Sequence, residues 1–131
     1  MKENGIFLCE KAILDGRTNM LSLVNMYEST LQPLGYPMGF SNIAFVCLLE
    51  NDSEDIGKVF KAQLSVHHNS IAISSIPVDI NFQGSRNTRL ILEFNGMIIN
   101  NEGDLVFELK LTDTEFSIVK KLRLLPAVKI K

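Results

Sequence analysis

The chain has 131 residues, of which 46% are apolar and 21% are charged, and its net charge is −2. This length fits one domain, so we expect a single unit over residues 1–131. The composition is that of a globular protein and argues against disorder. So small a net charge provides no strong electrostatic attraction for nucleic acid or for an anionic membrane, and we expect neither as a partner.

The N-terminal segment predicts a cytoplasmic protein. Residues 1–5 lack the features of a signal peptide, and the apolar run at residues 6–9 ends at Glu10. No apolar run approaches the roughly 20 residues that a membrane-spanning helix needs.

Eight β-strands and no helix are predicted along the chain. In each segment apolar residues either alternate with polar ones or run together, whereas a helix would place them at i, i+3, i+4 and i+7. The predicted strands are residues 6–14, 20–31, 40–49, 58–66, 71–82, 88–99, 105–111 and 116–125.

Turn signals separate the first three strands. Asp15 and Gly16 are typical of a reverse turn, so the first two strands are predicted to form a hairpin. Residues 32–39 contain two prolines and two glycines, which indicates a loop that crosses to another part of the sheet. The strand over residues 40–49 is apolar on both faces, which is typical of a central strand covered on both sides.

The later strands carry further positional signals. The alternation in residues 71–82 changes phase near Ser74 and Ser75, which predicts either a bulge or two short strands. Pro77 lacks an N–H donor, so this strand is expected at a sheet edge. The strand over residues 105–111 has the most regular pattern, and its inward residues are predicted to be Leu105, Phe107, Leu109 and Leu111.

The predicted fold is all-β, an antiparallel immunoglobulin-like β-sandwich of about seven to eight strands. Short strands separated by turn signals favour a sandwich or a barrel, and a strand apolar on both faces favours the sandwich. A parallel α/β fold is excluded because the sequence has no candidate crossover helices.

Both cysteines, Cys9 and Cys47, lie within apolar strands. We expect two buried, reduced thiols. A disulfide between them is the alternative if their strands are neighbours. Zinc binding is disfavoured because no C-x-x-C spacing occurs.

Both ends of the chain resemble a family of small bacterial proteins of unknown function. Residues 7–12 (FLCEKA) and 21–27 (LSLVNMY) resemble its N-terminal strands, and residues 102–109 (EGDLVFEL) are similar to its Gly-x-Tyr-x-Phe-x-Leu strand. That strand type also occurs in immunoglobulin-like sandwiches. Leu105 stands where an aromatic residue is usual, so the hydroxyl that ties such corners to the backbone is missing. The resemblance implies no activity.

Metal binding has two weak candidates. Adjacent residues on a strand face opposite ways, so His67 and His68 make a poor chelating pair and are expected as exposed turn residues. The acidic segment with Asp52, Glu54 and Asp55, together with Asn51, has carboxylates but lacks the alternating ligands and central glycine of a calcium loop. We expect a solvated loop there, and no cofactor.

No catalytic set stands out in the sequence. A nucleophile needs a base and an orienting acid, and the nearest pair, Ser65 with His67, is expected to face solvent on a single strand. The sequence has neither a G-x-S-x-G elbow nor a glycine-rich phosphate loop. The basic residues Lys120, Lys121 and Arg123 divide between strand faces, which indicates a solvated or edge-protecting role.

The loop around Tyr36 is the candidate interaction site. It presents four large apolar or aromatic residues between prolines and glycines, namely Leu34, Tyr36, Met38 and Phe40. Tyr, Met and Phe are enriched at interface cores, but the same residues also suit a plug for the end of the sandwich.

We therefore expect a non-enzymatic module that binds a protein partner or itself, through an edge strand or through this loop. The alternative is a small-ligand or carbohydrate-binding domain that uses the loop around Tyr36. The absence of Trp and the presence of only two Tyr weaken the carbohydrate alternative. A hydrolase with scattered residues is a third class.

Overall fold

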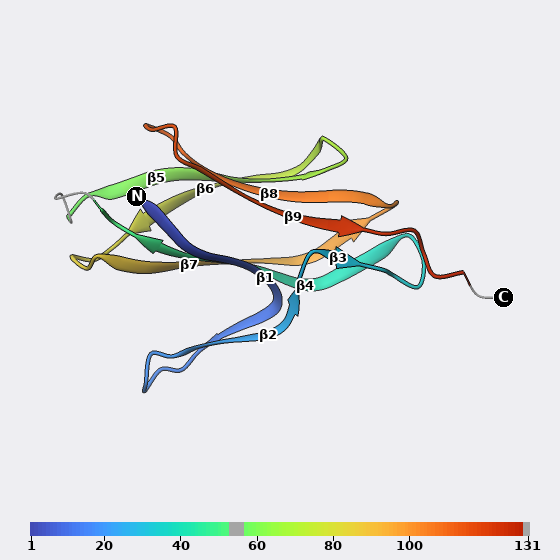
Figure 1. The fold of residues 1–131 in the computed structure, drawn as a ribbon, viewed down its shortest axis with the longest axis horizontal. Helices are drawn as coiled ribbons and strands as arrows, with labels where there is room; N and C mark the ends of the chain where they lie inside the picture. Colours follow the sequence, from blue (N-terminus) through green and yellow to red (C-terminus); the bar gives the residue numbers. More distant parts are fainter. Residues whose placement is uncertain (53–56, 130–131) are drawn as a thin grey trace.

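The computed structural model describes residues 1–52 and 57–129, which form nine β-strands in two facing layers (Figure 1). The strands are β1 (Lys2–Leu14), β2 (Leu21–Tyr27), β3 (Thr30–Leu31), β4 (Met38–Glu50), β5 (Val59–His68), β6 (Ile71–Asn81), β7 (Asn87–Ile99), β8 (Gly103–Leu111) and β9 (Ser117–Leu124).

One sheet has the strand order β2-β1-β4-β7 and the other has the order β3-β9-β8-β5-β6. The prediction of an all-β sandwich is confirmed. In the second sheet, β9, β8, β5 and β6 follow an order compatible with an immunoglobulin variable-type sheet. The immunoglobulin-like assignment itself stays a prediction. The described residues include no helix with the length and apolar character that crossing a membrane requires.

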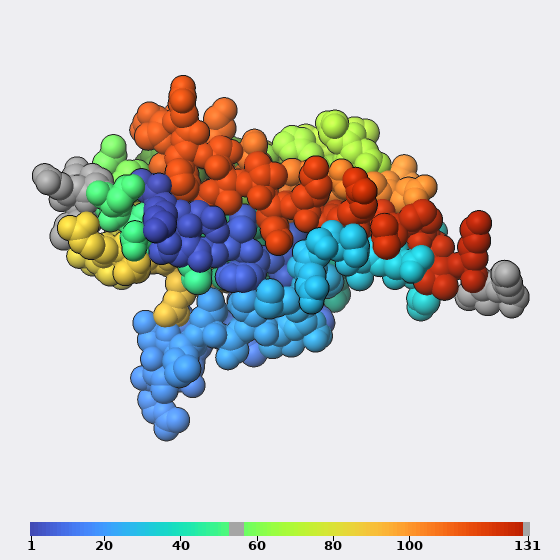
Figure 2. Space-filling model, viewed as in Figure 1, coloured from blue at the N-terminus to red at the C-terminus, as the bar shows by residue number. Residues whose placement is uncertain are grey.

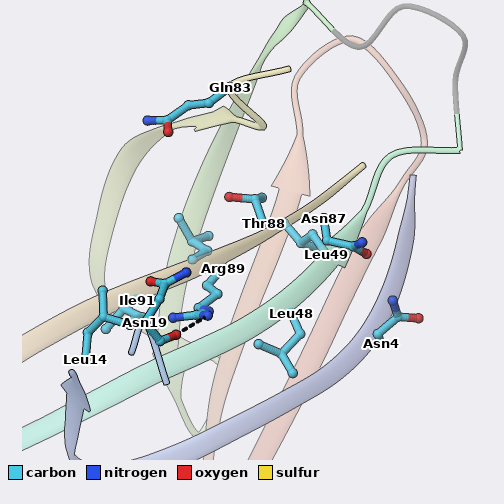
Figure 3. A pocket seen from close by; sticks show the side chains of 11 residues that line it. Asn4, Leu14, Asn19, Leu48, Leu49, Gln83, Asn87, Thr88, Arg89 and Ile91 are labelled. Carbon is cyan, nitrogen blue, oxygen red and sulfur yellow. Dashed lines mark hydrogen bonds between the residues drawn. The ribbon is translucent and has the colours of Figure 1, made fainter. Parts of the chain in front are cut away.

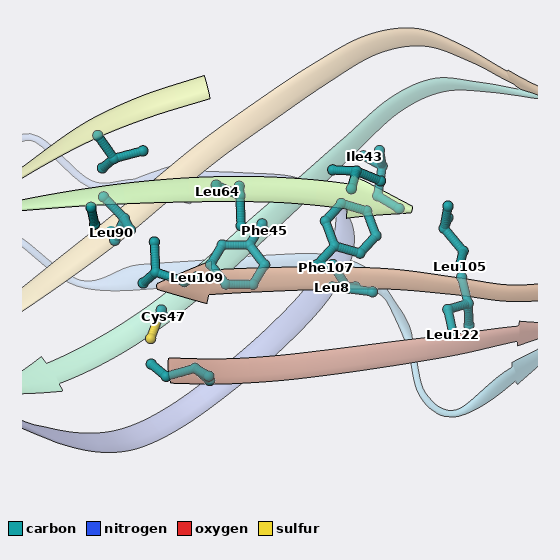
Figure 4. Packing of buried hydrophobic residues seen from close by; sticks show 14 of the residues in the cluster. Leu8, Ile43, Phe45, Cys47, Leu64, Leu90, Leu105, Phe107, Leu109 and Leu122 are labelled. Carbon is teal, nitrogen blue, oxygen red and sulfur yellow. The ribbon is translucent and has the colours of Figure 1, made fainter. Parts of the chain in front are cut away.

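The core lies between the two sheets (Figure 4). Phe45 of β4 stacks on Phe107 of β8 with ring centroids 6.1 Å apart, and neither side chain has exposed surface. Phe94 of β7 meets Phe107 edge-on at 5.8 Å. All four residues predicted to face inward in residues 105–111 are buried, which confirms that pattern.

The central position of β4 is also confirmed. Its outer face holds Ala44 and Val46, which are buried together with Cys9 of β1. The cover is the far half of the β1–β2 hairpin, from which Leu21 and Leu23 pack against these residues. Figure 1 shows this far half, residues 11–24, as an arm that stands out from the rest of the four-stranded sheet.

A corner in the β1–β2 hairpin places the arm over the sheet. Regular pairing of β1 with β2 lapses at Glu10 and Asn25, and Asn25 has a positive φ of 54°. The Asn25 side-chain amide donates to the Glu10 carboxylate at 2.7 Å, and that of Asn42 donates to the Glu10 carbonyl at 2.6 Å. These bonds fix the bend, so the arm packs on the sheet instead of extending it.

Two expectations about the strands near the edges are confirmed. Pairing of β5 with β6 shifts after Val66, which leaves Ile73 as the extra residue of a bulge. The strand that contains Pro77, β6, is the edge of the five-stranded sheet.

The predicted single strand over residues 20–31 was wrong. The chain leaves the first sheet after Tyr27, and β3 joins the other sheet as a parallel neighbour of β9. The backbone N–H groups of Arg123 and Leu125 donate to the carbonyls of Ser29 and Leu31, each at 2.9 Å. The segment that crosses between the sheets thus forms backbone hydrogen bonds with the end of β9. Because β3 runs parallel to β9, the five-stranded sheet is mixed instead of purely antiparallel.

Candidate functional site

Most of the loop around Tyr36 packs against the hydrophobic core. The Tyr36 hydroxyl donates to the Leu125 carbonyl at 2.7 Å, and partial burial raises its pKa, with a smaller effect from the charge of Glu102. Phe40 is 4% exposed and meets Tyr27 edge-on, with ring centroids 5.5 Å apart.

The other two loop residues differ in exposure. Met38 is half-buried at the start of β4, whereas Leu34 is 82% exposed. The structure therefore brings Tyr36, Met38 and Phe40 onto the core and leaves Leu34 as the open apolar side chain of the predicted set.

A groove of about 860 Å³ lies between the hairpin arm and the outer face of the four-stranded sheet (Figure 3). Leu14 and Asn19 line it from the arm, and Leu48, Arg89 and Ile91 line it from the sheet. The Arg89 guanidinium donates to the Asn19 carbonyl at 2.7 Å and so ties the tip of the arm to β7. Figure 2 shows the arm standing out from the body of the molecule.

A second hollow of about 440 Å³ is bordered by Asn69, Asp104 and Arg123, among others. Neither hollow is lined by the four residues of the predicted interaction loop. Neither of these two hollows therefore forms a binding pocket for the loop around Tyr36.

β7 is one of the two outer strands of the four-stranded sheet, the other being β2, and it pairs with β4 along its length. Its regular part runs from Asn87 to Asn95, because Gly96 follows with a positive φ of 75°. We call this stretch, Asn87–Asn95, the β7 edge. Within the described residues, its other side pairs with no strand.

The β7 edge is apolar toward the core and polar on part of its outer face. Leu92 and Phe94 point to the core and are only half-buried, because no strand of the described residues lies beyond them. On the outer face, Arg89 and Glu93 lie on either side of Ile91.

The edges of the five-stranded sheet have features that oppose pairing. On β6, Pro77 removes a backbone donor. On β9, β3 pairs only with Arg123 and Leu124, so the rest of the strand is an edge. Lys120 lies there opposite buried Phe107 and therefore on the core face, and an inward charge of this kind discourages a further strand.

The basic run divides between faces as expected. Lys121 and Arg123 point outward to the carboxylate of Asp104. The Lys121 Nζ lies 3.7 Å from Asp104 Oδ2, and the Arg123 Nε lies 3.2 Å from Asp104 Oδ1. These exposed ion pairs hold β8 to β9 on the outer face of the five-stranded sheet.

The two cysteines are free and buried, as expected. Cys47 pairs with Ile6 of β1 and faces the core, whereas Cys9 pairs with Ala44 and lies on the opposite face of the same sheet. A disulfide between them is therefore excluded by geometry. Burial raises the pKa of the Cys47 thiol to about 12, with a smaller contribution from the charge of Glu3.

The histidines are more enclosed than expected. His67 and His68 lie at the end of β5 and are half-buried, because the bulge at Ile73 lets β5 and β6 stay paired up to His68 and Ile71. The prediction that the two histidines face opposite sides of the strand is confirmed, since His68 lies across from buried Leu105 and His67 across from half-buried Val106.

The acidic segment is only partly described, because Glu54 and Asp55 lie outside the described residues. Asn51 is buried, and its backbone N–H donates to the Arg86 carbonyl at 2.7 Å. Asp52 accepts a hydrogen bond from the N-terminal amine, which lowers the pKa of its carboxyl. Across residues 1–52 and 57–129, no three His, Cys, Asp or Glu side chains are grouped to hold a metal ion.

A family model matches residues 4–120, and it describes a family of unknown function, DUF6941. The chain belongs to this family. The match extends well beyond the terminal segments that carry the resemblance in the sequence. A comparison with curated proteins found no match.

Sequence reasoning did not single out the β7 edge. A strand over residues 88–99 is predicted, but nothing local places this strand at an edge. The signal that was available is the near-palindrome Arg89-Leu90-Ile91-Leu92-Glu93, which has opposite charges at its ends.

Proposed function

We propose that this chain is a small cytoplasmic, non-enzymatic module that binds a polypeptide along the β7 edge. The observation that carries the proposal is a long outer strand with half-buried apolar side chains and without the blocking features of β6 and β9. An extended chain can add to such an edge through main-chain hydrogen bonds, with side chains supplying specificity.

The exposed backbone of the β7 edge supplies the affinity in this proposal. Every second residue of an edge strand directs its N–H and C=O away from the neighbouring strand, where a further strand can bond them. A partner strand would also cover the apolar side chains of Leu92 and Phe94, which removes their remaining apolar surface from water.

The cellular setting is part of the same proposal. Two free, buried thiols suit a reducing compartment such as the cytoplasm. The bacterial origin that the resemblance implies stays a prediction. So does a role for Leu34 in a contact, or for the loop around Tyr36 in binding a small ligand or carbohydrate.

Site-specific photo-crosslinking in the cells that produce the chain tests the proposal. A photoreactive amino acid replaces Asn95, which is exposed at the end of the β7 edge, and in a matched control it replaces Asp79, which is exposed on β6. We expect a discrete crosslinked polypeptide adduct from position 95 and none from position 79. No adduct from position 95, or equal adducts from both positions, would overturn the proposal.

A further inference from the structure

We propose that the strand that pairs with the β7 edge is the β7 edge of a second copy of this chain, an inference that rests on the proposed function. The two strands run antiparallel about a twofold axis through Ile91. This arrangement joins the two four-stranded sheets into one continuous sheet across the dimer.

Charge complementarity on the outer face supports this register. With the axis at Ile91, Arg89 lies directly across from Glu93 of the second copy, and the symmetry repeats the pair on the other side. Directly opposed side chains of opposite charge stabilise an antiparallel pair. The single sequence therefore supplies two ion pairs, with Ile91 facing its own copy between them.

The core face is complementary in the same register. Leu90 lies across from Leu92 of the second copy, and Thr88 lies across from Phe94. Leu92 and Phe94 are half-buried in one chain, so the second strand covers the apolar surface that the edge leaves in water.

Neighbouring registers lose this match. Moving the axis to Leu90 places Arg89 across from Ile91, and moving it to Leu92 places Arg89 across from Asn95. The axis at Ile91 also centres the regular part of the strand, because Asn87 and Asn95 are equally far from it and Gly96 ends the regular pairing.

Both charged residues are available for the second copy. Glu93 is exposed. The Arg89 guanidinium has five N–H donors, and its bond to the Asn19 carbonyl uses a donor on Nη2, so others can reach a carboxylate. The ion pair with Glu93 therefore does not require the bond between Arg89 and Asn19 to break.

Charge reversal and its rescue test the proposal in the purified chain. Sedimentation equilibrium from low to high micromolar concentration should show a dimer for the native sequence. Glu93→Arg places two like-charged pairs across the axis and should weaken the dimer by about tenfold or more. The double variant Arg89→Glu with Glu93→Arg restores opposite charges and should recover most of the affinity.

A matched control reverses a charge at the other sheet. Asp79→Arg on β6 removes an exposed ion pair with Lys61 and should leave association unchanged. Circular dichroism and the unfolding midpoint establish that each variant is folded. A native chain that stays monomeric, a Glu93→Arg variant that dimerises as well as the native chain, or a double variant as weak as Glu93→Arg would overturn the proposal. If the native chain is monomeric but position 95 still crosslinks to a different polypeptide, the self-association fails and the proposed function stands.

Discussion

The outer strands of the two sheets differ in how they meet solvent. On the five-stranded sheet, Pro77 and the inward Lys120 oppose the addition of another strand. On the four-stranded sheet, the β7 edge presents Leu92 and Phe94 on the core face and opposite charges on the outer face. This difference between β7 and the edges formed by β6 and β9 is the basis of the proposal that β7 accepts a partner strand.

An inward charge on β7, like that of Lys120 on β9, should weaken self-association more than any other change. Leu92→Lys places a charge on the core face at the proposed interface and should weaken self-association by roughly a hundredfold or more, about 3 kcal/mol. Val119→Lys on β9 is the control, because Val119 is 52% exposed and points outward. Sedimentation of both variants measures the effect, and equal association of the two would remove the distinction between the edges.

The buried thiol of Cys47, next to β7, should make the free energy of unfolding depend on pH. The Cys47 thiol lies across from Leu90 of β7, and burial raises its pKa from 9.0 to about 12. Its contribution to stability is complete below pH 9 and is lost as the pH rises toward 12, because the unfolded chain ionises first. From pH 9 to 10.5 this amounts to about 2 kcal/mol.

Denaturant unfolding at several pH values measures this loss. Cys47→Ala lacks the thiol, so it should be less stable than the native chain at pH 8 and should show a shallower decline above pH 9. An identical pH slope for the two chains would mean that Cys47 is not the titrating group.

A smaller effect is expected from opening the edge of β9. Lys120→Val removes the inward charge and should strengthen self-association or aggregation by about fivefold, or 1 kcal/mol. Lys121→Val is the control, because Lys121 points outward to Asp104. Light scattering at matched concentrations measures both, and no gain for Lys120→Val relative to the control would show that Lys120 does not guard this edge.

The smallest effect is expected at the loop around Tyr36. Leu34→Ser changes a side chain that is 82% exposed, so the unfolding free energy should stay within about 0.5 kcal/mol of the native value. If the β7 edge carries the binding, crosslinking from position 95 should also stay unchanged. A loss of the adduct in this variant would assign the contact to the loop.

Much of the fold could be predicted because alternation reports directly on strand faces. The inward positions of Leu105, Phe107, Leu109 and Leu111 and the edge position of Pro77 were predictable, since each signal is local. The separation of β2 from β3 was not predictable, because no Gly or Pro interrupts residues 20–31. The break depends on the partner strand β9, which lies far away in the sequence.

The site was predictable only in part. Tyr36, Met38 and Phe40 form a conspicuous apolar group, but whether such a group faces solvent depends on distant partners such as the Leu125 carbonyl and Tyr27. The outer position of β7 is likewise a property of strand order. Only the opposite charges of Arg89 and Glu93 about Ile91 were visible beforehand, and they acquire meaning once the strand is known to be an edge.

Amide hydrogen exchange along β7 measures whether a second strand covers the β7 edge. At high concentration, the amides of the β7 edge that point away from β4 should exchange slowly, and dilution should make them fast. The outward amides of β6 should exchange quickly at both concentrations, since no second strand covers them. Rapid exchange of the β7 amides at every concentration would mean that no second copy pairs with the β7 edge.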